Sequence, residues 1–162
     1  MRMTALLKIQ SEKVFHTNHS NLMRPAAVLL IQTRDGRFLS LRRSQGSELE
    51  HWGILGGMVD PGETPKEAAI REAYEEGKCI PQNNVDFLDT YIAYSPKYGK
   101  TPVHIFRTII DHPCQIRMNV EHDKLGWFKL RDWPEPKTGM MRFLINKYGT
   151  HLKHMHPTPF QK

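Results

Sequence analysis

The chain has 162 residues, of which 39% are hydrophobic and 25% are charged, and its net charge is +6. This composition predicts one globular domain and excludes a membrane-spanning protein, because no apolar run approaches the roughly 20 residues needed. A signal peptide is not expected, since the short apolar patch near the N-terminus lacks a cleavage site of small residues. Two cysteines are too few for a disulfide framework, so we expect free thiols in a reducing cytoplasm.

The elements that open the chain are an extension and a hairpin. Residues 1–24 are weakly patterned and predict an N-terminal extension or a first edge strand. An apolar run of strand-forming residues follows Pro25, and Asp35-Gly36 then predicts a hairpin turn, because both residue types tolerate positive φ. The second arm, a polar loop and a glycine-rich segment with a short strand are expected at residues 37–42, 44–50 and 52–59.

The clearest helix signal lies at residues 64–76. Thr64 predicts the N-cap and Pro65 the first helical position. Glu67 completes a capping box, and Gly77 predicts the C-terminal stop.

The remaining elements predict that a single domain ends near residue 148. Two strands are expected at 85–94 and 103–110, joined by a loop that holds Pro96, Gly99 and Pro102. A last strand is expected at 124–130, a closing helix at 136–148 and a flexible tail at 149–162. We see no repeat and no second domain, so the domain is predicted at 25–148.

Positive charge is unevenly distributed along the chain. Residues 57–79 hold six acidic and three basic residues, so this segment carries −3 and the rest of the chain carries +9. An acidic pocket in a basic body suits a polyanionic substrate bridged by a metal ion, since carboxylates bind the metal and basic residues attract the polyanion. The alternative is that the positive charge only keeps the chain soluble.

Three glutamates of the predicted helix carry the strongest chemical signal. Glu72, Glu75 and Glu76 are spaced i, i+3 and i+4, so they share one face in the last turn, where the helix dipole disfavours negative charge. A bound divalent cation removes this conflict, because it reverses the sign of the local electrostatics. Ligands that are all oxygen favour Mg²⁺, with Mn²⁺ as the alternative, over Zn²⁺.

The charged residues around these glutamates resemble the Nudix box, G-x5-E-x7-R-E-U-x-E-E-x-G-U, in which U is aliphatic. The matching positions are Gly57, Glu63, Arg71, Glu72, Glu75 and Glu76. Three positions depart from the family pattern: Ala73 is smaller than the usual aliphatic residue, Lys78 stands where a glycine is expected, and Leu55 stands where many relatives have proline. The resemblance covers roughly residues 25–148 and implies an α+β fold, a single α/β/α sandwich with a mixed central β-sheet, the box helix and a C-terminal helix.

Roles for individual residues follow from the same resemblance. It implies that the metal ligands are Glu72, Glu75, Glu76 and the backbone carbonyl of Gly56. Arg71 would orient the glutamates through ion pairs, and Glu63 would hold either Arg71 or a metal-bound water. Such ions would polarise a phosphoryl group and lower the pKa of the attacking water.

Residues outside the box complete the predicted site. Glu121 is the candidate for activating the water and Asp123 is the runner-up, the alternative being that both are ordinary loop acids. Arg42 and Arg43 would face substrate phosphates or only add solubility. Trp52 would stack on the base or sugar of the substrate, or cover the core.

The predicted activity is Mg²⁺-dependent cleavage of the pyrophosphate bond of a nucleoside diphosphate linked to another moiety. Nucleotide sugars, ADP-ribose, nucleoside triphosphates and dinucleoside polyphosphates all stay open as substrates. One alternative is an RNA 5′-end pyrophosphohydrolase or decapping enzyme. It rests on the +9 charge outside residues 57–79 and on basic residues near the ends of the chain, namely Lys8, Lys13, Arg142, Lys147 and Lys153. Another is a non-catalytic nucleotide-binding module, which would be expected to have lost box glutamates. The oligomeric state, a homodimer included, also stays open.

Overall fold

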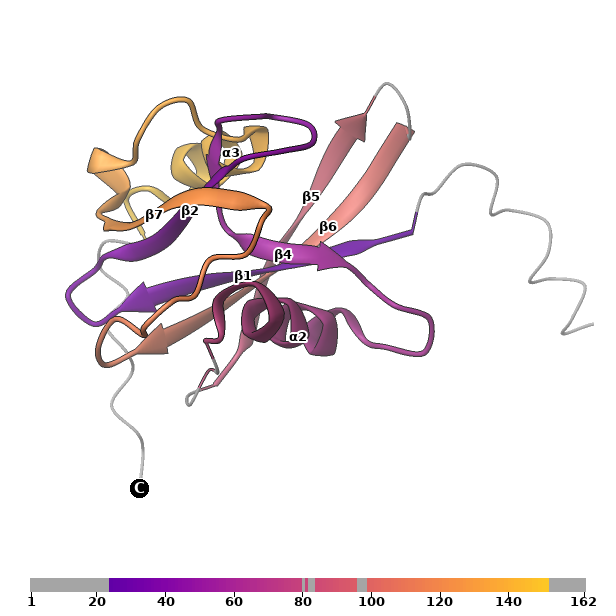
Figure 1. Cartoon of the computed structure of the whole chain (residues 1–162), viewed down its shortest axis with the longest axis horizontal. Coiled ribbons are helices and arrows are strands. Elements are labelled where there is room, and N and C mark those ends of the chain that lie inside the picture. Colours follow the sequence, from indigo (N-terminus) through magenta and orange to yellow (C-terminus); the bar gives the residue numbers. More distant parts are fainter. Residues whose placement is uncertain (1–23, 80, 82–83, 96–98, 152–162) are drawn as a thin grey trace, which may run out of the picture.

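A computed structural model describes residues 24–151 except 80, 82–83 and 96–98. Its described part is a seven-stranded mixed sheet with helix α2 on one face and helix α3 on the other (Figure 1). The elements are β1 Ala26–Thr33, β2 Phe38–Arg43, β3 Trp52–Gly53, β4 Leu55–Met58, α2 Pro65–Gly77, β5 Asp86–Ser95, β6 Gly99–Ile110, β7 His122–Phe128, the short 3₁₀ helix η1 Leu130–Asp132 and α3 Gly139–Tyr148. No helix in this part of the chain is long and apolar enough to cross a membrane.

Strand β1 lies at the centre of the sheet and separates two cores. It pairs antiparallel with β2 and β4 and parallel with β6. Its side chains alternate between the faces: Leu29 and Ile31 belong to the core that includes α2, whereas Val28 and Leu30 belong to the core that includes α3. A strand buried on both faces needs a covering layer on each side, so this alternation accounts for the predicted α/β/α sandwich.

The predicted hairpin and box helix are confirmed. Gly36 occupies the turn between β1 and β2 with φ of +82°, a conformation that glycine adopts without steric cost. Helix α2 begins after Thr64, whose side chain accepts a hydrogen bond from the amide of Glu67, and the Glu67 side chain accepts one from the Thr64 amide. At the other end Lys78 takes the left-handed conformation with φ of +55°, and its amide caps the helix. Lys78 therefore adopts the left-handed capping conformation that the glycine of the family pattern would take at this position.

Some boundaries differ from the prediction. Strand β6 starts at Gly99, so Pro102 lies inside it, opposite Ile92 of β5. The β1–β6 pairing begins only at Val103, so β6 has a single neighbour at Pro102 and the missing amide breaks no ladder bond on that side. Strand β7 runs from 122 to 128 rather than from 124 to 130, and α3 starts at Gly139 rather than at 136, because Thr138 caps it.

The expectation of free thiols is wrong. Cys79 and Cys114 form a disulfide, with their Cα atoms 6.1 Å apart and 35 positions separating them in the sequence. Cys79 follows the last residues of α2, and Cys114 lies on the segment after β6 that packs against the same core. The sequence could not show this pairing, because it depends on how these two distant segments fold together.

Several predictions concern surfaces and ends of the chain. The extension at 1–24 and the tail at 149–162 fall almost entirely outside the described residues, so their assignment stays a prediction.

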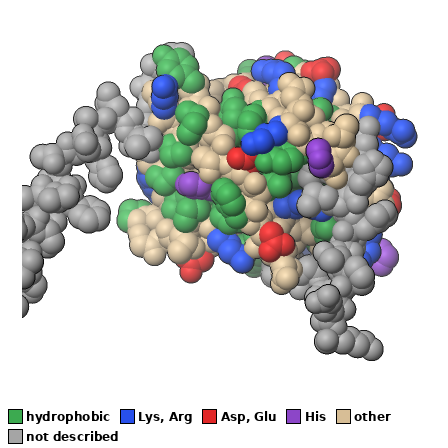
Figure 2. Space-filling model, turned by 180° about the vertical axis from the view of Figure 1, so that it is seen from behind, with side chains coloured by type: hydrophobic (Ala, Val, Ile, Leu, Met, Phe, Trp, Pro, Cys, Tyr) green, Lys and Arg blue, Asp and Glu red, His purple; other side chains and the backbone are tan. Residues whose placement is uncertain are grey.

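Strand β5 forms one edge of the sheet path and carries three large exposed hydrophobic side chains, Phe87, Ile92 and Tyr94. Hydrophobic side chains also gather on the face seen from behind (Figure 2). Nothing in the described structure tests whether a second copy covers them, so the homodimer stays a prediction.

Candidate active site

Helix α2 lies close to the sheet because small residues line its inner face. Ala68, Ala69 and Ala73 are fully buried, and the helix packs against β1 and β4. On β4, a Cβ added to Gly57 would lie 2.3 Å from Oε1 of Glu72, and one added to Gly56 would lie 2.4 Å from the Ala27 carbonyl oxygen. Glycine at both positions therefore lets the glutamates approach the strand backbone.

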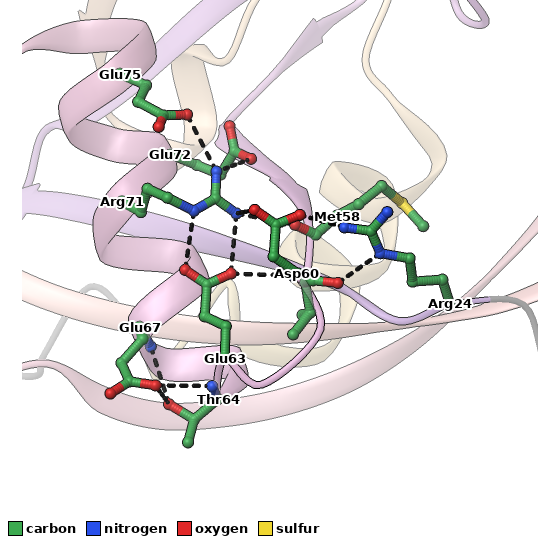
Figure 3. A network of polar contacts seen from close by, with 10 residues as sticks. Arg24, Met58, Asp60, Glu63, Thr64, Glu67, Arg71, Glu72 and Glu75 are labelled. Atoms are coloured by element: carbon green, nitrogen blue, oxygen red, sulfur yellow. Dashed lines mark hydrogen bonds and ion pairs between the residues drawn. The ribbon is translucent and has the colours of Figure 1, made fainter.

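Arg71 of helix α2 is the centre of an ion-pair network with the glutamates of the box (Figure 3). Its Nε and Nη2 donate to the two carboxylate oxygens of Glu63 at 2.8 and 3.0 Å. Its Nη1 donates to Glu72 at 2.7 Å and to Glu75 at 3.1 Å, and Nη2 also donates to the Met58 carbonyl at 3.0 Å. The guanidinium holds the pKa of Glu63 below its usual range. The structure thus places Glu63 on Arg71, one of the two arrangements that the resemblance implied.

The three helix glutamates differ in exposure, although their spacing places them on one face. The Glu75 side chain is 55% exposed and turned to Arg71, whereas Glu72 is 15% exposed. Glu76 is 5% exposed, and its Oε2 accepts a hydrogen bond of 3.2 Å from the Gly56 amide. The sequence could not separate these roles, because the difference depends on how close the helix lies to β4.

A second acidic group gathers around Glu76. Burial raises the pKa of Glu76 to about 8, and the negative charges of Glu72 and Glu121 act in the same direction. Burial also raises the pKa of Glu72, against the opposing influence of Arg71. Glu121 comes from the loop before β7, far from the helix in sequence, yet its carboxyl group is near enough to that of Glu76 to help raise the Glu76 pKa. Like charges that are brought together and desolvated need a proton or a cation to balance them.

These residues fit a hard divalent cation. Glu72, Glu76 and the Gly56–Gly57 backbone offer oxygen atoms, which suit Mg²⁺ or Mn²⁺. In the described residues no three acidic, histidine or cysteine side chains already converge as a ligand set. Arg71 holds Glu72 and Glu75 at hydrogen-bond distance. A cation would therefore compete with Arg71 for these two carboxylates.

The other predicted residues have partners of their own. Arg42 donates to both carboxylate oxygens of Asp123 at 2.9 and 2.5 Å, and this pairing lowers the pKa of Asp123. Asp123 is thereby occupied, which favours Glu121 as the group that could accept a proton. Arg43 donates to the Ser47 carbonyl at 3.0 Å. Trp52 packs edge-on against Phe128 with 5.4 Å between ring centroids, and it adjoins the core on the α3 side.

Sequence reasoning assigned no role to Asp60, yet this residue joins the network. Its carboxylate pairs with Arg24 and lies 3.6 Å from Nη2 of Arg71. Its amide donates to Glu63 at 3.0 Å, so Asp60 holds the loop that presents Glu63. An acidic residue between Gly57 and Glu63 of the box was the available signal.

A model of the NUDIX domain matches residues 22–143. The chain belongs to the Nudix hydrolase family. This Nudix chain is 33% identical to the asymmetrical bis(5′-nucleosyl)-tetraphosphatase of Rattus norvegicus over 99 residues, which are 57% of the chain and 64% of the relative. It therefore spans slightly less than two thirds of the length of that relative.

Two solved structures resemble this Nudix protein in fold and sequence. A MutT NUDIX hydrolase from Burkholderia pseudomallei is 27% identical with a TM-score of 0.69, covering 76% of this chain and 95% of that one. A Caenorhabditis elegans Ap4A hydrolase, in a binary complex, is also 27% identical with a TM-score of 0.66, covering 78% and 96%. These matches confirm the predicted family and fold class.

Proposed function

We propose that this Nudix protein is a Mg²⁺-dependent pyrophosphohydrolase that cleaves a nucleoside diphosphate linked to another moiety. The observation that carries the proposal is the buried carboxylate of Glu76, which accepts a hydrogen bond from the Gly56 amide, while Glu72 lies beside Gly57 and Glu121 is near enough to raise the pKa of Glu76. A structural helix gains nothing from a desolvated carboxylate among like charges, whereas a cation site requires one.

Each group has a distinct task in this proposal. Glu72, Glu75, Glu76 and the Gly56 carbonyl would hold the metal ion. When bound, Mg²⁺ supplies charge stabilisation for the phosphoryl oxygens and lowers the pKa of water. Arg71, held by Glu63, orients Glu72 and Glu75 through its paired hydrogen bonds. Glu121 accepts the proton of the water that attacks phosphorus, and the P–O bond of the anhydride breaks.

Among the open substrates we propose a dinucleoside polyphosphate. The support is the similarity to a bis(5′-nucleosyl)-tetraphosphatase and to an Ap4A hydrolase structure. The RNA alternative rests on basic residues of which Lys8, Lys13 and Lys153 lie outside the described structure, while Lys147 pairs with Asp89 at 2.6 Å. The cytoplasmic location stays a prediction, and the disulfide removes the argument from free thiols that supported it.

The experiment is a substrate panel with purified protein and Mg²⁺, in which released mononucleotide and phosphate are measured. The panel holds diadenosine tetraphosphate, a nucleoside triphosphate, ADP-ribose, a nucleotide sugar and a 5′-triphosphorylated RNA. We expect the first to be turned over fastest, and Glu76→Gln to remove the activity. Glu67→Gln is the matched control, because Glu67 lies on the same helix but only caps it. Faster turnover of the RNA would favour the alternative, and equal activity in Glu76→Gln would refute the site.

A further inference from the structure

The loop that carries Glu121 is tied to the end of β2 by one residue. The Ser44 amide donates to the Glu121 carbonyl at 2.9 Å, and the Ser44 hydroxyl donates to the Val120 carbonyl at 2.6 Å. Ser44 directly follows β2 and lies outside the box segment. Two consecutive carbonyls of the loop are therefore held by a single residue of the sheet.

Little else fixes this part of the loop. Val120 is 84% exposed and Met118 is 45% exposed, so neither side chain anchors the loop in a core. Within the described residues, the amides of Glu121 and His122 bond locally, at 3.0 Å to the side chain and 3.4 Å to the carbonyl of Asn119. These local bonds shape the turn but do not tie it to the rest of the protein.

The strand pairing itself is irregular at this point. Arg42 pairs with Lys124 but Arg43 pairs with His122, so Asp123 is an extra residue that forms a bulge in β7. A bulge changes the direction of the strand and interrupts the ladder, and bulges often re-aim a side chain beside an active site. Beyond the bulge, the Ser44 amide bonds to the Glu121 carbonyl as a ladder amide would. The Ser44 hydroxyl bonds in addition to the Val120 carbonyl, and a regular ladder has no such second bond from one residue.

We propose that Ser44 is a positioning residue, which fixes residues 120–121 so that the Glu121 carboxylate faces Glu76. The inference rests on the proposed function, because it assumes that Glu121 accepts the proton of the attacking water. The amide bond of Ser44 can be made by any residue other than proline, whereas the hydroxyl bond needs serine or threonine. Ser44→Ala therefore removes one of the two ties and leaves the backbone unchanged.

The kinetic test uses diadenosine tetraphosphate with Mg²⁺ and separates kcat from KM. Loss of one neutral hydrogen bond predicts roughly a fivefold lower kcat for Ser44→Ala with KM unchanged, and Ser44→Thr restores the rate. Ser47→Ala is the matched control, because Ser47 lies with Ser44 in the segment between β2 and β3, and this variant should keep the wild-type kcat. In a Glu121→Ala background, Ser44→Ala has no further effect, because the group it positions is gone.

A second measurement does not depend on turnover. The proposal predicts that, in hydrogen-exchange measurements on the metal-free protein, the amides of residues 119–122 exchange faster in Ser44→Ala than in wild type or in Ser44→Thr. Three results would each overturn the proposal. They are unchanged hydrogen exchange in Ser44→Ala, a wild-type kcat in Ser44→Ala, and a Ser44→Ala effect on kcat that is as large in the Glu121→Ala background as in wild type. If wild-type protein hydrolyses no anhydride with Mg²⁺, the proposed function fails instead. If Glu121→Ala keeps full kcat, the role of Glu121 fails and the inference fails with it.

Discussion

Replacing Glu76 by glutamine should stabilise the metal-free protein while removing activity. Burial raises the pKa of Glu76 from 4.5 to about 8, so the folded protein binds this proton more tightly than the unfolded chain. The stability contributed by this group is thus fully present below about pH 4.5 and is lost as the pH rises towards about 8. One pKa unit corresponds to about 1.4 kcal/mol, so the cost of ionising Glu76 at pH 8 is at most about 5 kcal/mol. Relaxation of side chains and entry of water reduce this cost, and we expect Glu76→Gln to gain about 2 kcal/mol, or roughly 6 °C in Tm.

The assay is thermal unfolding at pH 5 and pH 8, in EDTA and then with Mg²⁺. In EDTA, Glu76→Gln should melt above wild type at pH 8, and the difference should shrink at pH 5. Mg²⁺ at a hundred times its Kd should stabilise wild type by about 2.7 kcal/mol and leave Glu76→Gln unchanged. Glu67→Gln should keep both the pH dependence and the Mg²⁺ response of wild type. The reasoning is refuted if Glu76→Gln melts below wild type at pH 8 in EDTA, or if it gains as much from Mg²⁺.

Three further predictions concern the surroundings of this carboxylate. Arg71→Lys loses the forked hydrogen bonds of the guanidinium, so kcat should fall by at least about tenfold, and a kcat within twofold of wild type would count against the network. Gly57→Ala places a Cβ 2.3 Å from Oε1 of Glu72, so calorimetry should find Mn²⁺ binding at least about tenfold weaker with an unchanged circular dichroism spectrum, and unchanged affinity would contradict the close approach. Cys114→Ser opens a loop closed across 35 positions, which should lower the free energy of unfolding in urea by about 4 kcal/mol. Protein purified without reductant should show no thiols when unfolded, and two reactive thiols would contradict the pairing with Cys79.

The parts of the fold that the sequence predicted are those with local signals. Thr64, Pro65 and Glu67 mark the start of α2 within four positions, because capping is a contact between near neighbours. The first residue of β6 was misplaced, because Pro102 is tolerated only where the strand has one partner, and the partner strand lies far away in sequence. The disulfide was missed for the same reason.

The same distinction holds for the candidate site. The resemblance to the box predicted that Arg71 would hold neighbouring glutamates, and for Glu75 the i, i+4 spacing along the helix brings the two side chains together. It could not predict that Asp123 would be held by Arg42, because this contact joins two strands 81 positions apart. Nor could it predict the tie from Ser44 to the Glu121 loop, which spans 76 positions to Val120.

The most direct test of the central claim is a crystal structure of the protein soaked in Mn²⁺, with anomalous diffraction used to find the ion. We expect a peak within coordination distance of Glu72, Glu76 and the Gly56 carbonyl, with Arg71 having released at least one carboxylate. Glutamates that keep their pairing with Arg71, and no anomalous peak beside Glu76 at saturating Mn²⁺, would contradict the claim that this acidic group is a cation site.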